Sequence, residues 1–181
     1  MGAVVEPEGH LDRVLASDEA GFLSLVQPLL PVAQRLAHGM LRSPSEAEDV
    51  VQEATLKAWA KLRTFRPGTD FKSWYLTIVA NECRQTLRSG WWRVVRMPFV
   101  KRGSSPPPED RVVAGDEVRR ALERLSYDHR VVIVLRFYLD LSFEDIGRTL
   151  RISPDTAKSR THRALDRLRP IFSVPEVIGN E

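Results

Sequence analysis

The chain has 181 residues, 43% of them hydrophobic and 28% charged, which is the composition of a globular protein with room for one ordinary domain or two small ones. Its net charge of +3 divides into −1 over residues 1–92 and +4 over residues 93–181, and this split suggests two modules with different partners. The sequence shows no secretory leader, no apolar run near the ~20 residues of a membrane span and one cysteine, Cys83, so we expect a cytoplasmic protein without an internal disulfide or direct membrane insertion.

Two helices are predicted at the front of the chain. The first covers residues 21–41, with a break at Pro28 or Pro31 because proline lacks the amide donor of a helix interior. The motif "SPSE" at residues 43–46 predicts the start of the second, with a serine N-cap, a proline in the first turn and a glutamate that completes a capping box. Apolar residues at steps of three and four then define its buried face: Ala47, Val50, Val51, Ala54, Ala58 and Leu62.

The opposite face of this second helix is a polar stripe with one apolar member. Asp49, Gln52, Glu53 and Lys57 recur along it, and Leu56 lies among them. Two interpretations remain open for this helix alone. The stripe is either a solvated face with a single exposed leucine, or a docking surface with Leu56 as its apolar anchor.

A third helix follows the break at "RPGTD" and carries the sequence "FKSWYLTIVANECRQTLR". Trp74, Ile78 and Leu87 are placed to face the core. The same segment concentrates aromatic, amide and basic side chains at Phe71, Lys72, Tyr75, Asn81, Arg84 and Arg88. This mixture is used to hold single-stranded nucleic acid, because bases stack on rings and cations bind phosphates. The alternative is that the rings belong to the core, as aromatic residues at helical spacing usually do.

The stretch from Gly90 to Gly115 predicts a linker, since it contains "RGSSPPPED" and shows no apolar periodicity. We therefore expect an all-α fold of two small helical domains joined by a flexible proline-rich linker. The predicted boundaries are residues 1–92 for the first domain, 93–114 for the linker and 115–181 for the second domain, which contains a helix–turn–helix.

The second domain begins with two predicted helices. The segment "DEVRRALERL" is amphipathic and places Val118, Ala121, Leu122 and Leu125 inward. The next segment, "DHRVVIVLRFYLDL", has a β-branched run that would suit a buried strand. We predict a helix instead, because nothing else in the chain supplies a partner strand.

Two further short helices are predicted next. Ser142 and Asp145 form a capping box for the first of them, and Ile146 and Leu150 are placed to be buried. Gly147 costs ~1 kcal/mol in a helix relative to alanine, which is reasonable where a second helix must approach closely.

The last predicted helix follows a tight turn at residues 151–152, with Ser153 as its N-cap and Pro154 as its first residue. One face is predicted to be buried: Ala157, Thr161, Ala164, Leu165 and Leu168. The other face is basic and polar: Asp155, Lys158, Ser159, Arg160, His162, Arg163, Asp166 and Arg167. Such a pair of helices predicts a helix–turn–helix whose second helix enters the DNA major groove, where Arg163 is suited to a bidentate contact with guanine. The alternative is a basic amphipathic helix on a solvated surface.

In chain order these segments resemble a bacterial RNA polymerase sigma factor of the extracytoplasmic-function (ECF) subfamily of the sigma-70 family. "SEAEDVVQEATLKAWAKL" resembles the polymerase-binding helix of region two, and "FKSWYLTIVANECRQTLR" resembles the segment that melts and recognises the −10 promoter element. "LSFEDIGRTLRISPDTAKSRTHRALDRLR" resembles the region-four helix–turn–helix that recognises the −35 element. The resemblance covers about residues 20–90 and 115–170. A helix–turn–helix alone is shared with many regulators, whereas the three segments in this order around a proline-rich linker are specific.

The resemblance implies three groups of site residues. Docking on the clamp coiled coil of the polymerase's largest subunit is assigned to Asp49, Gln52, Glu53 and Leu56. Recognition of the −10 element is assigned to Phe71, Lys72, Trp74, Tyr75, Asn81 and Arg84, with the loop "RPGTDF" as the pocket for a flipped base. Recognition of the −35 element is assigned to Lys158, Ser159, His162, Arg163, Arg160 and Thr156. The sequence departs from the family at Gln85, where many relatives have an acidic residue, and at Gly147, where many have alanine.

The implied function is that of a dissociable specificity subunit without catalytic residues, metal or cofactor. Its partners would be core RNA polymerase, promoter DNA and an anti-sigma factor, and its linker would let the domains bind DNA more than two turns apart. A second hypothesis is a stand-alone helix–turn–helix regulator with a ligand-sensing first half. It predicts a pocket in residues 1–90 and tight DNA binding without polymerase, and Leu56 in its acidic stripe argues against it. An enzyme has little support, because the four histidines lie in different elements and no nucleophile–base spacing is present.

Overall fold

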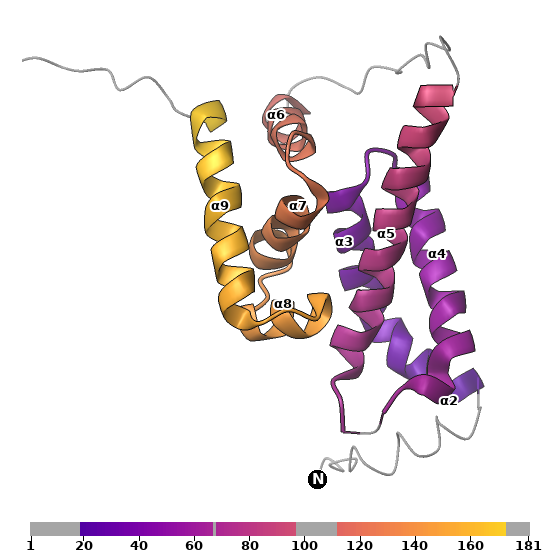
Figure 1. Cartoon of the computed structure of the whole chain (residues 1–181). Coiled ribbons are helices and arrows are strands. Elements are labelled where there is room, and N and C mark those ends of the chain that lie inside the picture. The colour runs from indigo at the N-terminus through magenta and orange to yellow at the C-terminus, as the bar shows by residue number, and fades with distance from the viewer. Residues whose placement is uncertain (1–18, 67, 97–111, 173–181) are drawn as a thin grey trace, which may run out of the picture.

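The computed structural model describes residues 19–66, 68–96 and 112–172, and within these ranges every regular element is a helix. We call residues 19–96 the first half and residues 112–172 the second half. The two halves pack against each other through α5 and α8 (Figure 1). The all-α fold class is confirmed, whereas the central part of the predicted linker, residues 97–111, lies outside the described residues.

Proline placement divides the first predicted helix where we expect it. α2 (Glu19–Val26) is followed by a short 3-10 turn, η1 (Gln27–Leu29), that contains Pro28. α3 (Leu30–Met40) then carries Pro31 in its first turn. Both prolines occupy positions where no amide donor is required, so the chain bends without leaving an acceptor unsatisfied inside a helix.

α4 (Pro44–Lys61) is the second predicted helix, and its cap is the predicted one. The Ser43 hydroxyl accepts a hydrogen bond from the Glu46 amide at 3.4 Å. Every residue of the predicted apolar face is buried: Ala47, Val50, Val51, Ala54, Ala58 and Leu62. This face packs on α3 and α5, which leaves the polar stripe on the outside of the molecule.

α5 (Phe71–Arg96) follows a short helical turn, η2 (Leu62–Thr64), and a loop. The helix extends six residues beyond Gly90, into the segment for which the sequence predicts a linker. Proline is what stops a helix, and the first proline of this segment is Pro98. Residues 91–96, which contain no proline, therefore continue α5.

The second half consists of α6 (Val112–Glu123), α7 (Tyr127–Ile133), the π-helical turn η3 (Val134–Tyr138), α8 (Phe143–Leu150) and α9 (Pro154–Phe172). The β-branched run in α7 and η3 is helical and buried, as predicted. The prediction for Val118 is wrong, because its side chain is 47% exposed. Beyond Val118, Ala121 of α6 and Leu125 of the turn that follows α6 belong to the core of the second half.

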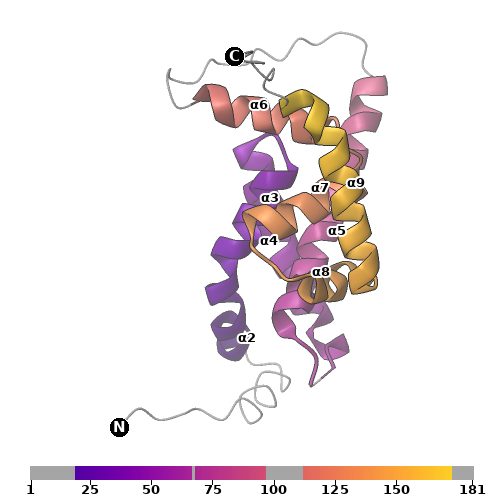
Figure 2. The ribbon, with the colours of Figure 1, turned by 90° about the vertical axis from the view of Figure 1, so that its left-hand side faces the viewer.

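One continuous set of buried apolar side chains joins the two halves. It runs from Phe22 on α2 through Tyr75 on α5 to Ile146 on α8 and Ala157 on α9. Figure 2 shows the same arrangement from the side, with α7 and α8 in front of α5. A separate small cluster holds α6, α7 and α9 together: Ala121, Leu125, Ile133, Ala164 and Leu168. The halves thus share a core in this arrangement, as well as having contacts of their own.

Candidate functional site

The outer face of α4 carries the stripe predicted to dock on a protein. All members of the predicted group are exposed: Asp49, Gln52, Glu53 and Leu56. Leu56 is 65% exposed. Lys57 donates to Glu53 at 3.2 Å and to Glu82 of α5 at 2.7 Å. The hydrogen bond to Glu82 raises the pKa of Lys57, so its ammonium stays charged and orients the Glu53 carboxylate on the same face.

Further apolar residues lie near this stripe, and the helix-face argument missed them. Trp59, three residues beyond Leu56 on α4, is 38% exposed. Its ring centroid lies 5.2 Å from that of Phe22, so α2 holds the indole in place. Leu23, the next residue of α2, is 49% exposed. Held aromatic and aliphatic side chains on a polar surface are typical of the anchors of protein interfaces.

The start of α5 combines a capped first turn with a group of aromatic rings. The Asp70 carboxylate accepts hydrogen bonds from the backbone amides of Lys72 at 3.2 Å and Ser73 at 3.1 Å. Phe71 and Trp74 each place a ring edge against Phe65, with centroids 5.4 and 5.3 Å away. Phe71 and Trp74 are half-buried, so each still presents part of its ring to the surface.

Tyr75, in contrast, belongs entirely to the core. Its side chain has 0% exposure, and its hydroxyl shares a 2.8 Å hydrogen bond with the Thr55 hydroxyl of α4. Burial raises the pKa of Tyr75, so the phenol is neutral. Tyr75 lies one turn before Val79, also 0% exposed, on the face of α5 that packs against the other helices. In this arrangement Tyr75 has no surface to offer to a base.

The polar members of the predicted −10 group lie along the rest of α5. Asn81 and Arg84 are exposed, and Lys72 is half-buried. The Arg84 guanidinium lies over the ring of Tyr127, 5.2 Å from its centroid. Tyr127 belongs to α7, so a side chain predicted to meet DNA is engaged here by the second half. Burial is the main cause that raises the pKa of Tyr127, whose phenol is therefore neutral beneath the cation.

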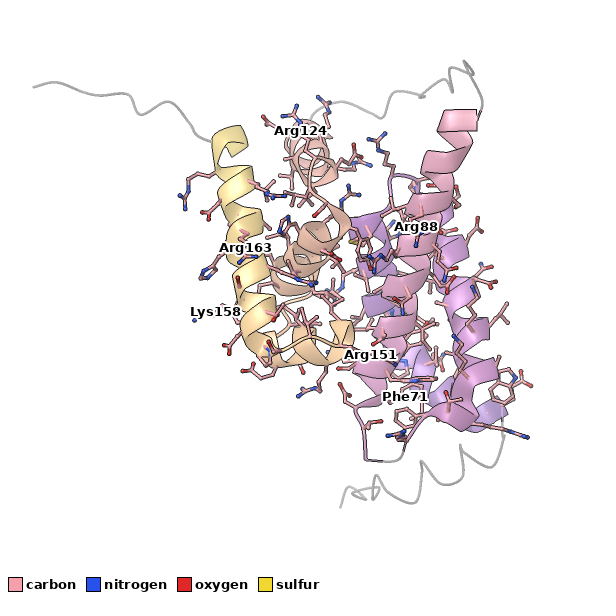
Figure 3. All side chains as sticks on the ribbon, viewed as in Figure 1. Phe71, Arg88, Arg124, Arg151, Lys158 and Arg163 are labelled. Atoms are coloured by element: carbon pink, nitrogen blue, oxygen red, sulfur yellow. The ribbon has the colours of Figure 1, made fainter. Side chains whose placement is uncertain are left out.

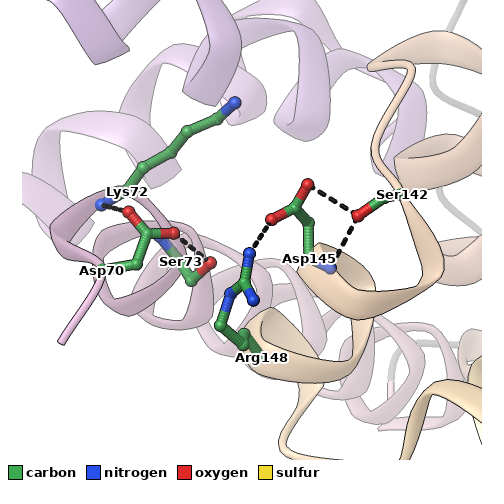
Figure 4. Close-up of polar contacts among 6 residues, drawn as sticks. All are labelled: Asp70, Lys72, Ser73, Ser142, Asp145 and Arg148. Carbon is green, nitrogen blue, oxygen red and sulfur yellow. Dashed lines mark hydrogen bonds and ion pairs between the residues drawn. The ribbon is translucent and has the colours of Figure 1, made fainter.

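A cleft of about 610 Å³, lined mainly by polar and charged residues, lies where the two halves meet at the start of α5. From the first half it is lined by Arg66 and Asp70 of the predicted flipped-base loop and by Trp74 and Thr77 of α5; from the second half it is lined by Arg148 and Arg151. Figure 4 shows Asp70 bound to Ser73 on one side and Arg148 paired with Asp145 on the other. The predicted base pocket is thus bordered by two arginines of the second half, which no local sequence signal indicates.

α8 and the turn after it form the first part of the predicted helix–turn–helix. The Ser142 hydroxyl accepts from the Asp145 amide at 3.1 Å and donates to the Asp145 carboxylate at 2.8 Å. The side-chain hydrogen bond from Ser142, followed by that from Arg148, lowers the pKa of Asp145. A Cβ atom on Gly147 would lie 2.8 Å from the carbonyl oxygen of Ile152. Another part of the chain does therefore approach Gly147 closely. The nearest atom belongs to the backbone of the turn between α8 and α9, and not to the second helix itself.

The turn itself depends on an unusual backbone conformation. Arg151 has φ 56° and ψ 46°, the left-handed region that favours glycine, and its amide donates to the Gly147 carbonyl. The chain then reaches Ser153, whose hydroxyl accepts from the Thr156 amide at 3.1 Å and caps α9 as predicted. Nothing in the residue type of Arg151 indicates a left-handed conformation, so sequence reasoning finds the turn but not its geometry.

α9 divides its residues between the core and solvent. Ala157, Thr161, Ala164 and Leu168 are buried as predicted. The prediction for Leu165 is wrong, since it is 38% exposed. At 100° per residue it lies about 80° around the helix from Ala157, at the margin of the packed face.

The predicted −35 residues all lie on or beside the open face of α9. Lys158, His162 and Arg163 are exposed, and Figure 3 shows Lys158 and Arg163 on α9 at the edge of the molecule farthest from α4. Thr156, Ser159 and Arg160 are half-buried. Arg160 also lies 4.0 Å from the Asp128 carboxylate of α7, so part of its charge is already balanced. The exposed members of this group, Lys158, His162 and Arg163, are all basic side chain types.

Comparisons with known proteins match two family models to successive parts of the chain. Residues 25–93 match the model of sigma-70 region 2, and residues 115–168 match that of sigma-70 region 4. The RNA polymerase sigma factor CarQ of Myxococcus xanthus is 31% identical over 92% of this chain and 98% of its own length. The ECF RNA polymerase sigma factor SigL of Mycobacterium tuberculosis is 32% identical over 85% of this chain and 90% of its own. The chain belongs to the ECF sigma factors.

A solved relative shows the same fold. The sigma factor RpoE of Bartonella quintana, determined in complex with the anti-sigma factor NepR, matches with a TM-score of 0.68 and 29% identity, over 85% of this chain and 98% of that one. Sigma factors are non-enzymatic transcription initiation factors. Within the described ranges of this sigma factor, no three His, Cys, Asp or Glu side chains are grouped to hold a metal ion, and no helix has the length and apolarity to cross a membrane.

Proposed function

We propose that this sigma factor binds core RNA polymerase through the outer face of α4 and positions α5 and α9 on the −10 and −35 promoter elements. The observation that carries the proposal is that the molecule presents two different surfaces, one acidic with exposed apolar residues and one basic. On α4, Leu56 is exposed within the acidic stripe and Trp59 is exposed beside it. α9, which carries the basic face, lies at the opposite edge of the molecule from α4 (Figure 1). A stand-alone DNA-binding protein has no need of the first surface.

The α4 face suits a helical protein partner of basic or mixed charge, which for this family is the clamp coiled coil of the largest polymerase subunit. Leu56 would be the desolvated anchor, and Asp49, Gln52 and Glu53 would form the polar rim around it. The held indole of Trp59 extends the apolar area at little entropic cost, because α2 already orders it.

The α9 face suits the major groove at the −35 element. Arg163 is assigned to a guanine edge, because its guanidinium can donate two parallel hydrogen bonds there. The remaining contacts to bases and phosphates are assigned to Lys158, Ser159, His162, Arg160 and Thr156. α9 has 19 residues, about 28 Å of helix, which is enough to cross the groove and reach both phosphate backbones.

The start of α5 suits unpaired bases of the −10 element. Phe71 and Trp74 offer partly exposed rings for stacking, and Lys72, Asn81 and Arg84 offer a cation or an amide. We assign the flipped base to the loop "RPGTDF". Extruding a base costs a few kcal/mol, and polymerase binding helps to offset this when the −10 region melts. Tyr75 supports this segment from within the core.

We also propose that the protein acts in the cytoplasm, without a cofactor or catalytic residue of its own, and that an anti-sigma factor controls it. The Bartonella quintana relative, solved with an anti-sigma factor, supports the last point. The alternative of a stand-alone regulator is less well supported, because it gives no role to the exposed Leu56 on α4.

The test is transcription in vitro with core polymerase freed of other sigma factors, on genomic DNA of the source bacterium. We expect promoter-specific starts that depend on the protein. Leu56→Asp should weaken core binding at unchanged stability, whereas Val118→Asp, a matched change at an exposed apolar residue of α6, should not. A protein that binds no core and directs no specific start would refute the proposal.

A further inference from the structure

The cleft at the start of α5 has the size and charge of a binding site for a small anionic ligand. Its volume of about 610 Å³ is usual for small-molecule sites. Arg66 borders it from the first half, and Arg148 and Arg151 border it from the second. Among the described residues that line it, Asp70 is the one carboxylate. Positive side chains therefore outnumber negative ones in the lining, which favours an anion.

The three arginines have hydrogen-bond donors to offer to such a ligand. All three are exposed. Within residues 19–66, 68–96 and 112–172, neither Arg66 nor Arg151 pairs with a carboxylate. Arg148 pairs with Asp145 (Figure 4), but a guanidinium has several N–H groups and keeps others for a ligand. Because a guanidinium binds phosphate through two parallel hydrogen bonds, phosphate is the anion that this set suits best.

The carboxylate of the cleft is already engaged by the protein. Asp70 accepts hydrogen bonds from the backbone amides of Lys72 at 3.2 Å and Ser73 at 3.1 Å, and from the Ser73 hydroxyl at 2.5 Å. These donors at the start of α5 balance part of its negative charge. Repulsion between Asp70 and a bound phosphate is therefore limited.

The hydroxyl groups that line the cleft present oxygen atoms rather than hydrogen atoms. Each of them already donates its hydrogen within the protein: Thr64, Thr69, Ser73 and Thr77. Each oxygen can therefore accept a hydrogen bond from a ligand but not donate one. Ser73 and Thr77 are only 6% and 9% exposed, whereas the arginines are exposed. The buried part of the lining thus suits O–H and N–H groups, and the exposed part suits phosphate.

Trp74 adds an aromatic ring to the same cleft, where it is half-buried. Its ring centroid lies 5.3 Å from that of Phe65 and 5.4 Å from that of Phe71. These two rings hold the indole in place, so little freedom is lost when a ligand stacks on it. Stacking on an aromatic side chain is favourable for any nucleobase.

We propose that the cleft binds a free nucleotide. Its base stacks on Trp74, the donors of its sugar and base meet the oxygens of Ser73 and Thr77, and its phosphates bind the three arginines. Both halves supply lining residues, so the nucleotide binds the arrangement in which they are packed and stabilises it. The stability of that arrangement then depends on the nucleotide concentration.

A DNA strand is the alternative occupant, and the proposed function argues against it. The −10 and −35 elements lie more than two turns of DNA apart, at about 34 Å per turn. Arg151 leads directly into α9, the helix assigned to the −35 element, whereas Trp74 is assigned to the −10 element. A cleft that brings these two residues together therefore does not hold a promoter strand, a point that rests on the proposed function.

Calorimetric titration of the full chain with ATP and with GTP tests the site, without polymerase or promoter. A salt concentration of about 0.15 M screens weak attraction between exposed charges. Adenosine lacks the phosphates and tripolyphosphate lacks the base and sugar, so these two compounds separate the contributions of the two ends of the nucleotide. We expect ATP or GTP to bind at least about tenfold more tightly than either compound, because both ends contribute.

Variants locate the binding. Arg151→Gly should weaken ATP and tripolyphosphate binding by about tenfold, because charge-assisted hydrogen bonds are lost. Glycine tolerates the φ of 56° at this position, so the unfolding midpoint without nucleotide should not fall. Arg66→Ala, on the other side of the cleft, should act in the same way. Trp74→Leu should weaken ATP binding by about tenfold and leave tripolyphosphate binding unchanged. Arg88→Ala, at an exposed arginine of α5 outside the cleft, is the matched control and should change neither.

Four results would overturn the inference. The first is no binding of ATP or GTP at about 1 mM. The second is tripolyphosphate binding as tight as that of ATP. The third is a loss of ATP binding in Arg163→Ala as large as that in Arg151→Gly, which would place the nucleotide on α9. The fourth is that Arg151→Gly weakens binding of a random-sequence single-stranded DNA by the same factor as binding of ATP, which would assign the cleft to a strand. Each leaves core binding by α4 untested, so failure here is distinct from failure of the proposed function.

Discussion

The two helices assigned to promoter recognition, α5 and α9, use their surfaces in opposite ways. α9 packs on α7 and α8 along one side and leaves a full face to solvent, with Lys158, His162 and Arg163 exposed. α5 packs against α3, α4 and α8, and Tyr75 of its predicted site has no exposure at all. A peripheral helix can reserve one face for DNA, whereas a central helix must divide each turn between the core and its ligand.

The largest expected effect tests whether α5 is first of all a core helix. Tyr75→Ala removes a fully buried ring and the partner of the Thr55 hydroxyl, so the free energy of unfolding in urea should fall by about 3–5 kcal/mol. Tyr75→Phe keeps the ring and should lose about 1 kcal/mol. Arg163→Ala on α9 should change stability by less than about 0.5 kcal/mol. A Tyr75→Ala protein as stable as the parent would remove the contrast between the helices.

The second effect concerns the open face of α9. Arg163→Ala should lose about 1–3 kcal/mol of binding at one base position of the −35 element, because a bidentate contact discriminates a single base pair. The measurement is holoenzyme affinity for a target promoter in which each −35 base is varied in turn. A uniform loss over all sequences would mean that Arg163 contacts phosphate, and α9 would then position the protein more than it specifies the site.

A smaller effect distinguishes two arginines on α5. Arg84 lies over the Tyr127 ring, so Arg84→Ala should lower the free energy of unfolding by about 0.5–1 kcal/mol. Arg88, one turn further along and also exposed, supplies the matched control, for which no measurable change is expected. Equal changes in the two variants would mean that the second half does not hold Arg84.

The smallest effect concerns the first turn of α8, which positions the turn before α9. The folded state lowers the pKa of Asp145, so its carboxylate stabilises the fold above the unfolded pKa of about 3.9, and this contribution is lost as the pH falls through the folded pKa. Asp145→Asn should therefore cost about 0.5 kcal/mol at neutral pH and less at about pH 3. Urea denaturation at both pH values measures this, and an equal cost at both would exclude the carboxylate charge as the cause.

Local signals in the sequence predict much of this molecule, since caps depend on neighbours within one turn. Ser43, Ser142 and Ser153 each cap the helix they are predicted to begin. Burial that depends on which helix packs where is harder to predict. Val118 and Leu165 lie at the margins of amphipathic faces, where hydrophobic periodicity alone does not say how far the partner helix extends.

The candidate site shows the same limit. The exposed groups on α4 and α9 follow from helix periodicity, because each helix has one packed side and one free side. The burial of Tyr75, the capture of Arg84 by Tyr127 and the cleft bordered by Arg148 all depend on contacts between segments far apart in the chain. No rule of spacing within one helix supplies such contacts.

The left-handed backbone of Arg151 has a consequence for how this sequence can change over generations. Glycine would relieve the conformational cost of the turn, yet it would remove one of the arginines that border the cleft between the halves. Selection for thermal stability alone would favour glycine at this position. If related proteins keep arginine at this position, its positive charge at the cleft contributes more to function than a more stable turn would.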